Sequence, residues 1–191
     1  MKNNEYHIIN EVFNARLEDQ VNGTLMTGYI YELGMPGKIL QSTGFPYEPI
    51  QLSARQLAMK SVDKNHPFHI ESVKNLVIAL QNPIGVFSYG DKSKSQNVIV
   101  ELQYGNKNFL VGVHFNTPNA NCISVSNIRD LFPKDNCEWL NWIAQEKALY
   151  LNKKKIQKLI GIQGINHSEP TYLDLNLVAK IVKKFKNPTK K

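Results

Sequence analysis

The chain has 191 residues, 42% of them hydrophobic, which is enough for one well-buried domain without a stabilising disulfide or metal. The formal net charge is +7, and its excess is confined to the end: from residue 147 onward eleven lysines stand against two carboxylates, whereas residues 1–146 are slightly acidic. No apolar run approaches the length of a membrane span, and the first residues hold no apolar secretion segment. We therefore predict a soluble, cytoplasmic protein with no membrane partner.

The first third of the chain is predicted to be helical with irregular connections. One helix is expected over 5–22, and the Gly- and Pro-rich segment 29–49 is expected to be irregular apart from a short helix near 38–41. Ser53 is placed to cap a second long helix, and a third follows His69 or Glu71. The side chains expected to face the core are Ile9, Val12, Phe13, Leu17 and Val21, then Leu57 and Met59, then Ile70, Val73, Leu76, Val77 and Leu80.

After Pro83 the apolar period changes from helical to alternating. Four strands are predicted in the stretches IGVFSYG, NVIVELQYG, NFLVGVHFN and ISVSNIRDLF. Their short connectors favour hairpins and hence an antiparallel meander. A capped helix (DNCEWLNWIAQEKA), a short strand (ALYL) and a further helix (KKKIQKLI) follow.

The predicted fold class is therefore α+β: N-terminal helices, a four-stranded antiparallel sheet and C-terminal closing helices. We predict one domain over 1–160, a linker over 161–171 and a basic amphipathic helical tail over 172–191. The tail has two interpretations. It attracts an anionic partner such as nucleic acid through phosphate contacts, or it is a solvated, solubilising extension.

Several well-known catalytic and binding motifs are absent from the sequence. There is no Gly-rich phosphate loop, no HExxH metalloprotease motif and no GxSxG nucleophile elbow. Cys122 and Cys137 have neither CxxC spacing nor histidines at zinc-finger intervals, so we predict two reduced thiols, no metal and no cofactor.

The remaining chemistry lies in scattered histidines and cations. His66 precedes a proline in a loop, where it serves as a general acid or base, or alternatively braces the following helix. His69 is either part of the same cluster or a solvated residue of the first turn. On the third strand, His114 and Asn116 share the face opposite the apolar residues, and Gly112 leaves room above it.

The fourth strand carries Arg129, which is suited to bind a phosphate through two hydrogen bonds. Its alternative is a surface salt bridge to Asp130 or Asp135. Lys60, near the end of its helix, is a weaker candidate of the same kind. RNA cleavage without a metal needs a base, an acid and a cation near the phosphate, because the 2′-hydroxyl supplies the nucleophile.

Ordered blocks from about Phe13 to Ile160 resemble the phage MuF C-terminal domain family. They include FNARL, ELGMPGKILQSTGFPYEPIQLS, HPFHIESVKNL, NPIGVFSYGDKSKSQNVIVELQ, SNIRDLFPKDNCEWLNWI and KALYLNKKKIQKLI. Such domains occur in phage head-morphogenesis proteins and in polyvalent proteins of phages and conjugative elements. The resemblance implies membership of a nuclease-toxin superfamily with barnase, EndoU, colicin-type tRNases and RelE. The shared core of that superfamily is a helix followed by a four-stranded antiparallel sheet.

The resemblance also implies a site. The histidine-proline block of the family falls on His66, its Asn/Ser-Ile-Arg block on 126–129, and its Phe-Pro-Lys-Asp block on 132–135. The expected catalytic residues are His66, Arg129, Lys60, Ser126 and Asn127, and the expected substrate-binding residues are His114, Asn116 and Lys134. Relatives often have Asn-Ser where this chain has Ser126-Asn127, so the resemblance assigns no specific role to that hydroxyl.

Three functional hypotheses follow from the sequence. The first is a metal-independent endoribonuclease, a toxin-like effector of a phage or mobile element that acts on cellular RNA such as tRNA, is delivered into a target cell and has an immunity protein. The second is a non-catalytic module that binds nucleic acid or a host protein during DNA entry or against host defence. The third is a part that only assembles a larger particle. Cleavage of RNA separates the first from the other two.

Overall fold

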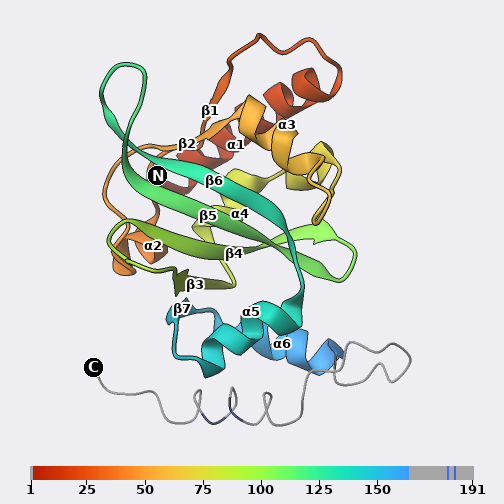
Figure 1. Ribbon diagram of the computed structural model, residues 1–191, viewed down its shortest axis with the longest axis vertical. Coiled ribbons are helices and arrows are strands. Elements are labelled where there is room, and N and C mark those ends of the chain that lie inside the picture. Colours follow the sequence, from red (N-terminus) through yellow and green to blue (C-terminus); the bar gives the residue numbers. More distant parts are fainter. Residues whose placement is uncertain (1, 164–179, 181–182, 184–191) are drawn as a thin grey trace.

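The computed structural model describes residues 2–163 together with Lys180 and Lys183, and its fold is the predicted mixture of helices and strands (Figure 1). Apart from residues 161–163, which belong to the last helix, and those two lysines, the predicted linker and tail lie outside the described residues. The helices are α1 (Lys2–Val21), α2 (Lys38–Ser42), α3 (Ala54–Ser61), the 3₁₀ helix η1 (Ile70–Val73), α4 (Leu76–Gln81), α5 (Asn136–Ala144) and α6 (Lys153–Gln163).

The strands of the described residues form one seven-stranded sheet in the order β1-β2-β6-β5-β4-β3-β7. The prediction of a four-stranded sheet is wrong, although the antiparallel meander at its centre is confirmed. A parallel neighbour of β6 and an outer strand extend one edge, and the predicted short strand ALYL extends the other. The strands are β1 (Ile30–Glu32), β2 (Ile50–Ser53), β3 (Gly85–Ser88), β4 (Ser95–Tyr104), β5 (Lys107–Pro118), β6 (Ser124–Lys134) and β7 (Ala148–Leu151).

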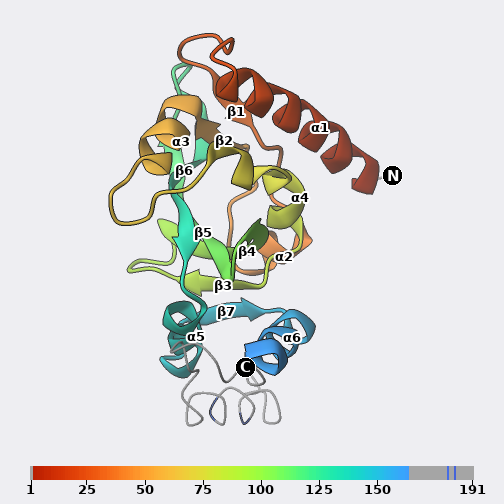
Figure 2. The same ribbon diagram turned by 90° about the vertical axis from the view of Figure 1, so that its right-hand side faces the viewer.

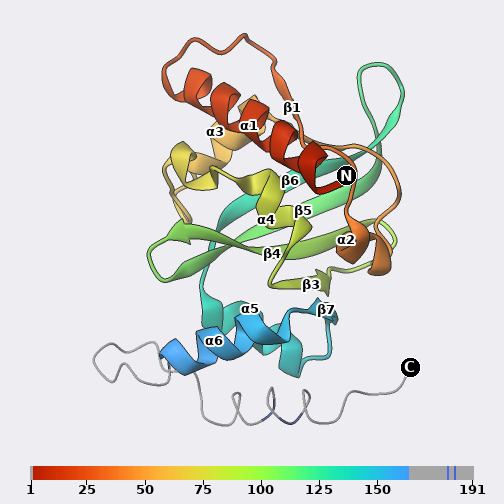
Figure 3. The ribbon, with the colours of Figure 1, turned by 180° about the vertical axis from the view of Figure 1, so that it is seen from behind.

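One face of the sheet is covered by α1 and α4, as the view from behind shows (Figure 3). Phe13 and Leu17 of α1 are buried there against alternate residues of the central strands. The prediction of a continuous stripe along α1 is wrong at Val12 and Val21, which are exposed, and Met59 of α3 is exposed as well. Phe13 and Leu17 are thus its fully buried hydrophobic residues, and Tyr6 and Ile9 pack against the same core with partial exposure.

The helix predicted from His69 or Glu71 is interrupted at Asn75. This residue adopts the left-handed conformation (φ 69°) and separates η1 from α4. Its side-chain oxygen accepts hydrogen bonds from Asn10 and Asn14 of α1 at 2.9 and 3.0 Å, and its N–H donates to the side chain of Asn14. Contacts with another helix thus fix a break that helical periodicity does not reveal.

The opposite face of the sheet is only partly covered. Trp139, Leu140 and Ile143 of α5 pack on Ile99 and Leu110 near the β3 and β7 edge. In side view, α3 and α5 lie on the same side of β6, whereas α1, α2 and α4 lie on the other (Figure 2). We call the sheet surface between α3 and α5 the open face.

The predicted helix caps of α3 and α5 are confirmed. The hydroxyl of Ser53 accepts the N–H of Gln56 at 3.5 Å, and the carboxylate of Asp135 accepts the N–H of Cys137 at 2.8 Å. Both helices therefore begin where the sequence places them. No helix among the described residues is both long and apolar enough to cross a lipid bilayer.

Candidate functional site

The open face carries a groove of about 270 Å³. It crosses the strands from β6 toward the end of β3 and is bounded by α5. We call it the open-face groove. Its lining residues are Tyr89, Ser95, Gln96, Asn97, Leu110, Gly112, Val113, His114, Asp130, Phe132, Lys134 and Trp142.

Gly112 lines the groove at a position where its neighbours leave little room for a side chain. Gly112 pairs with Asn97 of β4 on one side and with Asp130 of β6 on the other. A Cβ atom at this position would lie 3.0 Å from Cβ of Asp130 and 3.4 Å from the side-chain oxygen of Asn97. The room predicted above Gly112 is therefore not found, because the side chains of Asp130 and Asn97 occupy it.

An ion pair closes the β6 end of the groove. The ammonium group of Lys60, on α3, lies 2.6 Å from a carboxylate oxygen of Asp130, and both side chains are partly exposed. The structure thus brings Lys60 to the open face, as predicted, through a partner 70 positions away in the chain. The pair carries no net charge, but it holds a partly exposed ammonium group beside the groove.

His114 lines the groove from β5 with an exposed side chain. In the sheet register it lies between Ser95 of β4 and Asn127 of β6. Residues directly opposite each other on neighbouring strands share a face. His114 and Asn127, both predicted site residues, are therefore neighbours on the open face.

His66 lies at the rim of the groove. Its ring stacks on Phe132 with centroids 4.5 Å apart and planes 13° apart. The loop that carries it is anchored by buried Phe68, whose N–H donates to Ser61, and by Tyr104, whose hydroxyl donates to the carbonyl of Pro67. The predicted loop histidine is thus held beside a residue that lines the groove.

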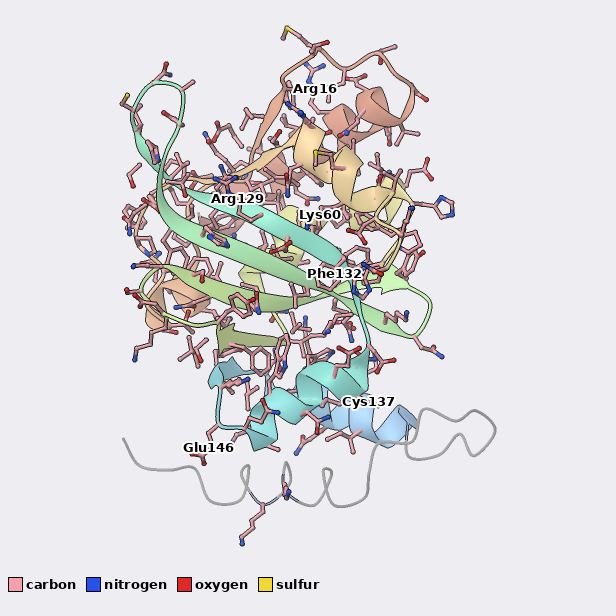
Figure 4. All side chains as sticks on the ribbon, viewed as in Figure 1. Arg16, Lys60, Arg129, Phe132, Cys137 and Glu146 are labelled. Carbon is pink, nitrogen blue, oxygen red and sulfur yellow. The ribbon has the colours of Figure 1, made fainter. Side chains whose placement is uncertain are left out.

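Lys134 also lines the groove, at its α5 end. Its ammonium group forms an ion pair with Glu138 and lies 5.9 Å from the centre of the Trp142 ring. Arg129 is exposed on β6, and its alternative role in a salt bridge to Asp130 or Asp135 is not observed among the described residues. Figure 4 labels Arg129 and Phe132 of β6 and, close to that strand, Lys60 of α3.

Of the predicted site residues, only His114 and Lys134 line the groove; Arg129 and Asn127 are not in its lining, and Ser126 and Asn116 lie elsewhere. Ser126 is 0% exposed, and its hydroxyl donates to the carboxylate of Glu48 at 2.8 Å. The alternation of β5 breaks between His114 and Thr117, where Asn116 has φ 51° and donates its N–H to the same carboxylate at 2.9 Å. Ser126 and Asn116 therefore lie around Glu48 rather than beside His114.

We expect Glu48→Ala to lower the free energy of unfolding by about 1–3 kcal/mol, because it leaves buried donors without an acceptor. Glu48 is 7% exposed and accepts from Ser124, Ser126 and the N–H of Asn116. Urea denaturation measures the change, and Ser124→Ala, which removes one donor from an exposed residue, is the control. An equal loss in the two variants would contradict a shared role of this carboxylate.

Sequence reasoning missed several lining residues. Asp130 was considered only as a partner of Arg129, and Asn97, Tyr89 and Trp142 were not considered as site residues. Asn97 had a detectable signal, since it begins an otherwise apolar run, NVIV, on a central strand. No local signal marks Tyr89 or Trp142, because their shared cavity depends on how α5 folds back on β3.

The cysteines take no part in the groove lining. Burial, followed by the negative charge and the hydrogen bond of Asp135, raises the pKa of the Cys137 thiol. This environment disfavours the reactive thiolate. Within the described residues, no three or more His, Cys, Asp and Glu side chains gather in a way that would hold a metal ion.

Comparison with known proteins gives one family. The model of the phage MuF C-terminal domain matches residues 58–158, from within α3 to within α6. The matched segment is shorter than the 13–160 span of the resemblance, but it contains every strand that lines the groove. Searches of curated proteins and of solved structures give no significant match.

Proposed function

We propose a function for this chain, which belongs to the phage MuF C-terminal domain family. The proposed phage-associated function is cleavage of cellular RNA without a metal ion. The observation that carries the proposal is the open-face groove. It gathers His114, the Lys60–Asp130 pair and Lys134 on one surface, with His66 at the rim. These residues supply the proton-transfer groups and the positive charge that the reaction requires.

The proposed reaction is an attack by the ribose 2′-hydroxyl on the adjacent phosphorus. His114 accepts the hydroxyl proton as the 2′-oxygen–phosphorus bond forms. His66 donates a proton to the leaving 5′-oxygen as its bond to phosphorus breaks, which leaves a 2′,3′-cyclic phosphate and a 5′-hydroxyl. An imidazole can accept or donate a proton near neutral pH, so the residue type suits both steps.

The cations stabilise the charge that develops on the phosphate. Lys60 is held by Asp130 at the β6 end of the groove, and Lys134 is held by Glu138 at the α5 end. Arg129, exposed on the same strand as Asp130, is proposed to bind a neighbouring phosphate. Asn127 is proposed to hydrogen-bond the ribose beside His114. Ser126 takes no part in this proposal because its hydroxyl is buried on Glu48.

The test is incubation of the purified protein with total RNA and with a defined tRNA in EDTA, with analysis of the product ends. We expect discrete fragments ending in a 2′,3′-cyclic phosphate. Lys60→Ala should reduce the cleavage rate about 10²- to 10³-fold, the usual cost of removing a preorganised electrostatic group. Lys64→Ala, an exposed lysine in the following loop, is the matched control.

The non-catalytic alternative gives a different result. A binding module would leave RNA intact while the protein is folded, and it would bind nucleic acid with an affinity that falls as salt rises. A module that binds only a host protein, or a part that only assembles a larger particle, would give neither cleavage nor salt-dependent binding of nucleic acid. Equal cleavage by the native protein and by Lys60→Ala would contradict the proposed site.

A further inference from the structure

The α5 end of the groove differs chemically from the β6 end. At the β6 end lie the charges of Lys60 and Asp130, whereas at the α5 end the aromatic side chains of Tyr89 and Trp142 line the groove together with Lys134. Tyr89 is 63% exposed, although large aromatic side chains are usually buried. An exposed aromatic ring at the wall of a cavity is a typical platform for stacking an unpaired base.

The floor between these ends carries an unused amide. Asn97 is only 9% exposed and lines the groove, yet its side-chain amide has no hydrogen-bond partner among the described residues. Among the described residues the buried side-chain atoms without a partner are those of Gln81, so the Asn97 amide is accessible from the groove, where it can bind a ligand.

The sheet register fixes the distance between the two ends. Phe87, Asn97, Gly112 and Asp130 lie opposite one another on β3, β4, β5 and β6. Neighbouring strands are about 4.8 Å apart, so the backbones of Asn97 and Asp130 are about 10 Å apart, whereas side-chain atoms of both come within 3.4 Å of where a Cβ atom of Gly112 would lie. The Asn97 amide and the Asp130 carboxylate therefore border the same part of the floor.

We propose that Asn97, Tyr89 and Trp142 form a nucleobase subsite of the groove, in which the aromatic rings stack on an unpaired base and the Asn97 amide binds its edge. The inference deepens the proposed function and rests on its single-stranded RNA substrate. An asparagine amide donates and accepts at once, the pattern that pairs with the N6 and N7 edge of adenine. Adenine is therefore the base expected to bind most tightly.

The test uses tetradeoxynucleotides of each base and an abasic tetramer, since DNA lacks the 2′-hydroxyl needed for cleavage. Tryptophan fluorescence reports binding at Trp142, because Trp139 is fully buried. We expect the adenine tetramer to bind best. Tyr89→Ala should weaken its binding about ten- to a hundred-fold, as is usual for the loss of one stacked base, and Asn97→Ala should abolish the preference among bases.

The chain offers matched controls. Tyr47 is 70% exposed and does not line the groove, so Tyr47→Ala should bind like the native protein, as should Asn121→Ala in the exposed β5–β6 turn. Equal binding of the abasic and adenine tetramers would overturn the subsite. RNA cleavage that is unaffected by Tyr89→Ala and Asn97→Ala would also overturn it while leaving the nuclease proposal intact. Base-selective binding without RNA cleavage would support the subsite and contradict the nuclease proposal.

Discussion

Replacing His114 by alanine is expected to reduce the rate of RNA cleavage about 10²- to 10⁴-fold, the range for loss of a positioned general acid or base. His114 lines the open-face groove between Ser95 and Asn127, where a ribose hydroxyl can reach it. Because its side chain is exposed, the free energy of unfolding should change by no more than about 0.5 kcal/mol. Single-turnover cleavage of a defined tRNA in EDTA measures the rate, and urea denaturation measures the stability.

His69→Ala is the matched control for this variant. His69 is an exposed histidine that precedes η1 and does not line the groove, so its removal should leave the cleavage rate unchanged. His66→Ala should lower the rate as well, since His66 lies against Phe132 at the rim. A His114→Ala protein that is folded and cuts RNA at the native rate would exclude His114 as the base.

Trp139→Ala is expected to lower the free energy of unfolding by about 3–5 kcal/mol, a large part of the stability of a single domain. Trp139 is 0% exposed and packs against Phe87 of β3. Its indole N–H donates to Asn136 at 2.9 Å, and Asn136 in turn accepts from Asn108 of β5 at 2.7 Å. The variant leaves a cavity under α5 and removes one bond from a buried network.

Trp142→Ala is the comparison variant for this loss of stability, because Trp142 belongs to the same helix but lines the groove. Trp142 lies three positions further along α5 and is only partly buried, so its loss should cost clearly less stability. Denaturation in urea, followed by circular dichroism, compares the two variants. Equal destabilisation would mean that α5 is held by its whole surface rather than by Trp139.

The architecture explains why the groove lies where it does. Helices α1 and α4 bury one face of the sheet with apolar side chains, so that face has no room for polar chemistry. On the other face α5 covers only the part near β3 and β7. The uncovered part carries the polar side chains of β4, β5 and β6, and α3 adds Lys60 from its edge.

Much of the central sheet could be predicted from the chain alone. The alternating period from Gly85 to Phe132 identified the four meander strands, because half-buried strands repeat every two residues. Ser53 and Asp135 marked the starts of α3 and α5 through their capping chemistry. The positions of His66, Lys60 and His114 in a loop, a helix and a strand mark them as candidates, and the family resemblance adds Lys134, but neither gives their mutual positions.

The edge strands could not be predicted in the same way. β1 has three residues and β2 four, which is too short for a period to show. They form because β2 pairs with β6, with Ile50 opposite Ser126, more than 70 positions further along. Such pairing depends on the rest of the sheet rather than on local sequence.

What the sequence by itself determined was the set of local elements and the residue types available for chemistry. Only the tertiary structure decided which of those residues meet. The break at Asn75, the pairing of Lys60 with Asp130 and the burial of Ser126 on Glu48 all join positions more than 60 residues apart. Local periodicity reports which side of an element is buried, whereas contacts across such separations are set by how the elements pack.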